Sequence, residues 1–136
     1  MPYCTATDYA ARYGEDELIQ RTDRLGTGVM DTVVFDQAAA DADAEIDGYL
    51  AGRYTLPLAG VPSILVRLAC DIVRYRLFID KAPEEVRKRY EDARRLLENL
   101  AAGRITLGLP GAGPAPVPAG DLVEIAPGRK VFGGGV

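Results

Sequence analysis

The sequence contains no histidine and no tryptophan, and its 136 residues include only two cysteines. Without histidine, the chain lacks the side chain that most often acts as a general base near neutral pH. Every Ser-His or Cys-His nucleophile is excluded for the same reason. No other spacing in the sequence supports catalysis. We therefore expect a protein that is not an enzyme and that uses no cofactor.

The two cysteines, Cys4 and Cys70, stand far apart and follow no metal-binding spacing. Cys70 lies in an apolar helical stretch, so we expect a buried small hydrophobe there. Cys4 lies near the first residue and is expected to be a free thiol. Two such cysteines, without an apolar export signal at the N-terminus, indicate a reducing cytoplasm.

An excess of basic residues and a long apolar run are also missing. The net charge is −4 and the isoelectric point is near 4.8, which argues against a protein that binds mainly by neutralising phosphates. No apolar run approaches the roughly 20 residues that span a bilayer, so we expect no membrane partner. The length suits one domain rather than two.

The most patterned stretch is an acidic, alanine-rich segment, residues 36–58. Its apolar positions repeat with helical spacing and predict one buried stripe, formed by Phe35, Ala38, Ala39, Ala42, Ile46, Tyr49 and Leu50. The opposite face carries only small side chains, at Ala40, Ala44, Gly48 and Ala51. A water-exposed helix face is normally charged. We therefore predict that this helix packs on two sides, once in its own domain and once against a neighbour.

The acids of this segment divide between the two flanks of the stripe, with Asp36, Asp43 and Asp47 on one and Asp41 and Glu45 on the other. They resemble a calcium loop only at first sight. An EF-hand needs glycine at its sixth position and glutamate at its twelfth, and Ile46 and Gly52 stand there. We interpret the acids as solvated or ion-paired flanks, with a weak cation site as the alternative. Similarly, Gly26 and Gly28 indicate a plain loop rather than a phosphate loop.

Capping and breaking signals predict helices over residues 5–13, 15–22, 31–51, 62–80 and 82–103. The helix over 62–80 is apolar nearly all round and should be central, with Arg76 paired to a carboxylate on the flank of the acidic helix. The last helix should carry surface ion pairs between acids and bases four residues apart, namely Glu84–Lys88, Glu85–Arg89 and Glu91–Arg95. Its basic residues predict a solvated face or, alternatively, a contact with a neighbour's acidic helix.

After Gly103 the sequence becomes rich in proline and glycine. Residues 108–120 hold four prolines and four glycines and predict no regular element. Residues 121–125 and 130–132 alternate like short strands. Strands of that length are not stable alone, and adding to another protein's sheet would satisfy them. The expected fold is all-α, a four- to five-helix bundle (residues 1–107) with a Pro/Gly-rich C-terminal arm (residues 108–136) carrying short β-strand segments.

A series of short motifs, taken in their order along the chain, resembles the pattern of a known protein family. It begins with Ala42-Asp43-Ala44-Glu45-Ile46-Asp47-Gly48-Tyr49-Leu50, Arg53-Tyr54 and Leu56-Pro57-Leu58, and continues through Val61-Pro62, Leu68-Ala69-Cys70-Asp71-Ile72, Arg74-Tyr75-Arg76-Leu77, Pro83-Glu84-Glu85-Val86, Arg89-Tyr90 and Gly103. Over roughly residues 3–107 the chain resembles the Mu-like prophage connector family, which is similar to the small helical head–tail adaptors of long-tailed phages.

The resemblance implies a structural virion protein located at the head–tail junction and assembled in the host cytoplasm. Such adaptors form a homo-oligomeric ring, commonly of twelve copies, between the portal protein and a tail terminator or stopper protein. DNA passes through the ring without specific binding, and a C-terminal arm commonly docks on the portal. The alternative from another class is a soluble helical regulatory or DNA-binding protein encoded by a prophage.

The residues assigned to these contacts form two sets. The ring interface is predicted to pair one copy's acidic helix with the last helix of the next copy, through Ala40, Asp41, Asp43, Ala44, Asp47 and Gly48 against Arg87, Arg94 and Arg95. The portal-docking arm is predicted to use Leu122, Val123, Ile125, Arg129, Val131 and Phe132. No catalytic, cofactor-binding or metal-binding residue is assigned.

Overall fold

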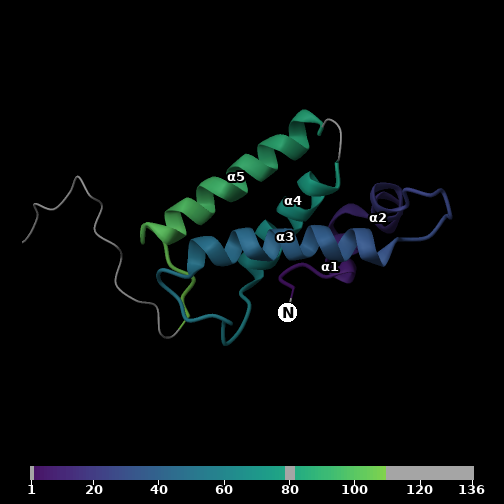
Figure 1. The fold of residues 1–136 in the computed structure, drawn as a ribbon. Helices are drawn as coiled ribbons and strands as arrows, with labels where there is room; N and C mark the ends of the chain where they lie inside the picture. Colours follow the sequence, from purple (N-terminus) through teal and green to yellow (C-terminus); the bar gives the residue numbers. More distant parts are fainter. Residues whose placement is uncertain (1, 79–81, 110–136) are drawn as a thin grey trace, which may run out of the picture.

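The computed structural model describes residues 2–78 and 82–109, and within them the chain is all-helical. Five helices follow one another: α1 (Ala6–Tyr13), α2 (Glu15–Thr22), α3 (Thr32–Leu50), α4 (Ser63–Leu77) and α5 (Glu84–Ala101). Figure 1 shows α3, α4 and α5 as the three long helices, with α1 and α2 beside one half of α3. The helical class is confirmed for this region. The strand segments expected in the arm lie outside the described residues.

Local signals set the short helices at the predicted places. The Thr5 hydroxyl accepts the Asp8 N–H at 3.1 Å, and the Asp8 carboxylate accepts the Thr5 N–H at 3.1 Å. This reciprocal capping box satisfies two backbone donors at the start of α1. Gly14 ends α1 with φ 97°, a conformation that favours glycine. The acids of residues 15–17 then occupy the first turn of α2, where the helix dipole favours negative charge.

The core lies between α3, α4 and α5, which pack against one another in all three pairs. The predicted buried stripe of α3 is confirmed for six of its seven residues, with Ala42, Ile46 and Leu50 fully buried, whereas Tyr49 is only half-buried. As predicted, α4 is central, because most of its circumference is buried, at Leu65, Leu68, Ala69, Cys70, Asp71, Ile72, Val73 and Leu77.

The predicted end of the helix over 62–80 is wrong, because α4 ends at Leu77. Phe78 has an extended conformation (φ −82°, ψ 97°) and its N–H bonds to Tyr75 rather than one residue further back. The guanidinium of Arg21 lies over the Phe78 ring, 4.5 Å from its centroid. This cation–π contact with α2 stabilises Phe78 in its extended conformation.

A cluster of side chains centred on Glu45 joins the three long helices. The Glu45 carboxylate accepts a hydrogen bond from Arg76 of α4 at 2.6 Å and another from the Tyr90 hydroxyl of α5 at 3.1 Å. The Tyr90 ring stacks on Tyr75 with centroids 4.1 Å apart. The prediction that Arg76 pairs with a flank carboxylate of the acidic helix is therefore confirmed.

The two short helices contact α4 through a narrow polar stripe that includes Asp71 and Arg74. Asp71 is buried and accepts a hydrogen bond from the Tyr13 hydroxyl of α1 at 2.5 Å. Arg74 donates two hydrogen bonds to Glu17 of α2, at 2.7 and 3.0 Å, and its guanidinium lies 4.3 Å from the centroid of the Tyr13 ring. The stripe is thus a docking surface for α1 and α2.

Candidate functional site

The outer face of α3 is open in the single chain. Ala40, Ala44, Gly48 and Ala51 are all exposed, as the helical wheel predicts. A Cβ built on Gly48 would meet nothing within 4 Å. Because no long side chain covers these four positions, another surface can approach the helix backbone closely. The predicted contact with a neighbouring copy stays a prediction.

Two of the flanking acids contact the chain's own N-terminal segment. The Tyr3 N–H donates to Asp43 at 3.0 Å, and the Tyr3 hydroxyl donates to Asp47 at 2.5 Å. Burial, and then the bond to Asp47, raises the pKa of Tyr3, while burial raises the pKa of the Asp43 carboxyl. Asp41, in contrast, is exposed. Sequence reasoning missed these bonds because Tyr3 is 40 residues away from Asp43 along the chain.

The arginines of α5 pair with acids of their own helix. Arg87 bonds both Glu84 at 2.9 Å and Glu91 at 2.7 Å, so the expected Glu84–Lys88 and Glu91–Arg95 pairs are replaced. The neighbouring pairs are Arg95–Asp92 at 3.1 Å and Arg94–Glu98 at 3.6 Å, while the expected Glu85–Arg89 pair is confirmed at 3.3 Å. These side chains are at least 43% exposed, so each pair contributes little to stability.

Arg94 also lies against its own α3. A hydrogen bond with Tyr49 is the largest cause of the raised pKa of Arg94. Among the three arginines assigned to the ring contact, this one is therefore influenced by Tyr49 of α3 as well as by Glu98 of its own helix.

The two thiols meet in the core. The sulfur atoms of Cys4 and Cys70 lie 2.7 Å apart, and both cysteines are free and buried. The hydrogen bond from Cys70, together with burial, raises the pKa of the Cys4 thiol far above its ordinary value. A high thiol pKa and burial both suppress reactivity. The pair therefore helps to pack the N-terminal segment against α4 and provides no nucleophile.

The α3–α4 loop (residues 51–62) is hydrogen-bonded to the end of α5 and to the segment that follows it. Arg53 donates to the carbonyls of Leu100 at 3.1 Å and Ile105 at 3.3 Å. The Leu107 N–H donates to the Tyr54 hydroxyl at 2.9 Å. These bonds determine where the chain leaves the helical body toward the predicted arm.

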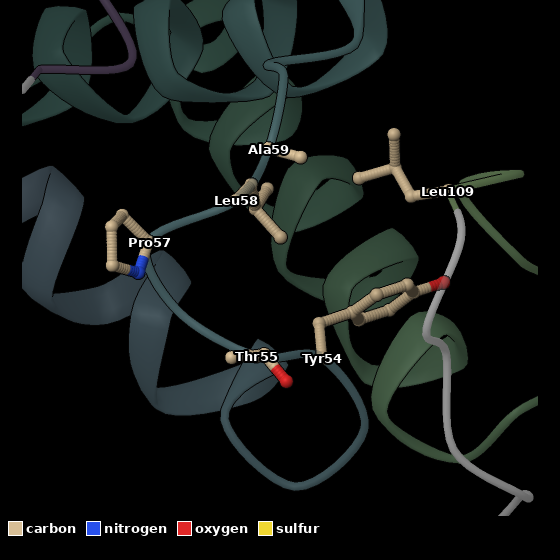
Figure 2. A pocket seen from close by; sticks show the side chains of 6 residues that line it. All are labelled: Tyr54, Thr55, Pro57, Leu58, Ala59 and Leu109. Atoms are coloured by element: carbon tan, nitrogen blue, oxygen red, sulfur yellow. The ribbon is translucent and has the colours of Figure 1, made fainter.

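A hollow of about 200 Å³ lies at this junction, lined by Tyr54, Thr55, Pro57, Leu58, Ala59 and Leu109. Figure 2 shows Leu58 and Leu109 approaching it from two different segments, with the Tyr54 ring beside them. The lining is mostly apolar and has no ionisable group besides the tyrosine hydroxyl, which already bonds Leu107. This surface suits an apolar side chain rather than a charged ligand.

The α2–α3 loop (residues 23–31) is shaped by one carboxylate. Asp23 accepts hydrogen bonds from the Thr27 N–H at 2.8 Å, the Thr27 hydroxyl at 3.0 Å and the Gly28 N–H at 2.6 Å. The backbone bonds to Thr27 and Gly28 lower the pKa of Asp23. Gly26 and Gly28 adopt φ of 73° and 83°. The two glycines thus serve the turn, as the plain-loop interpretation predicts.

The described residues meet neither the requirements of a metal site nor those of a membrane-spanning helix. Within 2–78 and 82–109, no group of three or more acids or cysteines is placed to hold a metal ion. In the same part of the chain, no helix has the length and apolar character to cross a bilayer. What the described chain offers instead is a set of surfaces: the outer face of α3, the hollow beside Leu109 and the α2–α3 loop.

The arrangement is that of a small all-helical protein whose distinctive features are contact surfaces. A family model for the bacteriophage Mu protein Gp36 matches residues 3–125. The chain therefore belongs to this family of Mu-like phage proteins, as its motifs indicate.

Two relatives show the same relationship. Gene product J of Escherichia phage Mu is 37% identical over 133 residues, which cover 97% of this chain and 94% of the relative. The Mu-like prophage FluMu protein gp36 of Haemophilus influenzae is 46% identical over 80 residues, or 59% of this chain and 57% of the relative. Membership of a Mu gene-product family suggests a phage structural or assembly protein.

Proposed function

We propose that the protein is a structural virion protein, a head–tail adaptor that forms a homo-oligomeric ring between the portal and the tail-side proteins. The match of residues 3–125 to the Mu Gp36 family carries the proposal, together with the resemblance of the motifs to small helical adaptors. In this role the protein acts through its surfaces alone, without a cofactor or a catalytic group, and it resides at the head–tail junction of the virion.

The charge distribution supports a channel through which DNA passes without specific binding. The net charge is −4, and Arg87, Arg94 and Arg95 are each paired with a carboxylate of α5. A regulatory DNA-binding protein would need unpaired basic side chains gathered on one face to neutralise phosphates. The adaptor is therefore favoured over that alternative.

The position of the chain exit supports the role of the arm. Leu107 is tied to Tyr54, and the carbonyl of Ile105 is tied to Arg53, so every copy in a ring would present its C-terminal segment at the same place. The portal-docking residues, Leu122, Val123, Ile125, Arg129, Val131 and Phe132, lie outside the described residues. Their docking by strand addition remains part of the proposal.

Truncation after Leu109 tests the proposal. The shortened protein keeps every described contact of the helical body and should show the helical circular dichroism of the full chain. It should no longer bind purified portal protein or join heads to tails. A matched control replaces residues 110–118 by a Gly/Ser spacer of equal length, which should retain portal binding. Portal binding at the full-length level by the truncated protein would show that the arm is not the docking element.

A further inference from the structure

The exposed large apolar side chains of the described residues gather at two opposite ends of the molecule. Leu25, Val29 and Val33 lie in the α2–α3 loop and the first turn of α3, and are 83%, 63% and 72% exposed. Val61, Ile64 and Ile105, each 36–38% exposed, lie near the other end of α3. The 19 residues of α3 separate the two groups by roughly 28 Å, and Figure 1 shows the two loops at opposite ends of that helix.

The α2–α3 loop is organised in a way that holds Leu25 in water. Three hydrogen bonds to Asp23 close the turn around it, and two glycines provide its left-handed backbone. Removing apolar surface from water stabilises a protein by about 25 cal/mol per Å². An exposed leucine forgoes this stabilisation. A loop that is ordered before binding loses little entropy when it binds. These features are typical of a preformed contact element.

At the opposite end of α3 lies an apolar hollow that suits an aliphatic side chain such as that of Leu25. The hollow of about 200 Å³ lies between Leu58 and Leu109, beside the exposed Ala59 (Figure 2). A water molecule's share of liquid volume is roughly 30 Å³, so the hollow has room for one branched aliphatic side chain in place of several waters. Such a side chain is exposed to water in the α2–α3 loop and would be buried against the apolar walls of the hollow.

We infer that Leu25 of one copy of this chain inserts into the hollow between Leu58 and Leu109 of the next copy. A protruding apolar group and a complementary hollow at a different place on the same molecule generate a head-to-tail contact, and such contacts build a ring when the rotation closes. The inference rests on the proposed ring and names one of its contacts. The contact is separate from the predicted one between the outer face of α3 and α5.

Two exposed substitutions in the full-length protein test this contact. Leu25→Glu removes the inserting group, and Ala59→Arg fills the hollow. Each variant should associate at least about tenfold more weakly than the wild type in sedimentation velocity, because a fully buried leucine supports that factor or more. Gln20→Glu, which adds the same charge at an exposed position of α2, should assemble normally. Circular dichroism should show that all variants are folded.

Mixing the two variants gives the sharper result. Leu25→Glu keeps an intact hollow and Ala59→Arg keeps an intact Leu25, so an equimolar mixture has one functional contact per pair. Relative to either variant alone, the mixture should gain a 1:1 dimer that is joined by this contact. A wild-type chain that stays monomeric at the highest attainable concentration, a Leu25→Glu variant that assembles normally, or a mixture that yields no dimer would each overturn the inference. In particular, if the chain's own arm or the portal occupies the hollow, Leu25→Glu assembles normally.

The outcomes separate this inference from the proposed function. If the wild-type ring forms but survives Leu25→Glu, the head-to-tail contact is wrong while the adaptor role stands. If the ring depends on Leu25 but head–tail joining proceeds without the protein, the contact stands and the adaptor role is wrong.

Discussion

The carboxylate of Glu17 is predicted to be the polar group on which the docking of the short helices most depends. It accepts two hydrogen bonds from Arg74 and one from the Tyr9 hydroxyl, at 2.7 to 3.0 Å. The side chains of Glu17 and Arg74 are only 22% and 14% exposed, and Tyr9 is fully buried. The perturbation to make is Glu17→Ala, which removes the acceptor and leaves both donors in place.

The magnitude follows from these contacts. Breaking a buried pair by removing one partner costs about 3–5 kcal/mol, but the residual exposure of this pair and the stacking of Arg74 on Tyr13 reduce the loss. We expect the free energy of unfolding to fall by about 2–4 kcal/mol. For a domain of this size, 1 kcal/mol corresponds to roughly 4 °C in Tm, so Tm should drop by about 10 °C.

Thermal and urea unfolding followed by circular dichroism measure the effect. Glu15→Ala is the matched control, because Glu15 lies exposed on the same helix and contributes only the dipole term of about 0.3–1 kcal/mol. A double-mutant cycle with Arg74→Met should then return a coupling of at least about 1 kcal/mol. If Glu17→Ala unfolds within about 0.5 kcal/mol of the wild type, the contact is a surface pair and the reasoning is refuted.

Four further predictions follow from other parts of the chain. Ile46→Ala should lower stability by about 2–5 kcal/mol in urea unfolding, because the side chain is fully buried; a loss below about 1 kcal/mol would contradict its place in the core. Cys4 and Cys70 should react with a thiol reagent only as fast as the protein opens, because both are buried and the pKa of Cys4 is raised; rapid labelling of the native chain would contradict this. Burial raises the pKa of Glu17, but the bonds from Arg74 and Tyr9 outweigh it, so the pKa is lowered overall. The stabilisation by Glu17 is therefore full above its unfolded pKa, about 4.3, and is lost as the pH falls through the lower folded value. Comparing Glu17→Gln with the wild type below pH about 4.3 isolates this slope, since the opposite contribution of the raised pKa of Asp43 is common to both proteins. Ala44→Glu on the exposed face of α3 should disturb the ring and leave the monomer's unfolding unchanged within about 0.5 kcal/mol; an intact ring would refute the packing of α3 on two sides.

The sequence by itself determined the elements and their faces. Several helix boundaries are set by local signals, namely the Thr5 hydroxyl with Asp8, the glycine at residue 14 and the proline at residue 62. These signals act through hydrogen bonds and backbone sterics between neighbouring residues, so they do not depend on the tertiary structure. The apolar stripe of α3 and the nearly all-apolar α4 likewise predicted which faces are buried. The acid on the flank of α3 was identified as the partner of Arg76 because a guanidinium on an apolar face needs a carboxylate within reach.

Only the tertiary structure decided which distant groups meet. The bonds of Tyr3 to Asp43 and Asp47, the contact of Cys4 with Cys70 and the pairing of Glu17 with Arg74 all join residues at least 40 positions apart. No periodicity encodes such contacts, because they depend on how the short helices dock on the long ones. The contact of Arg21 of α2 with Phe78, just after the end of α4, also joins residues that are far apart in the sequence. The hollow beside Leu109 likewise exists only because the α3–α4 loop and the segment after α5, more than 40 residues apart, close on each other.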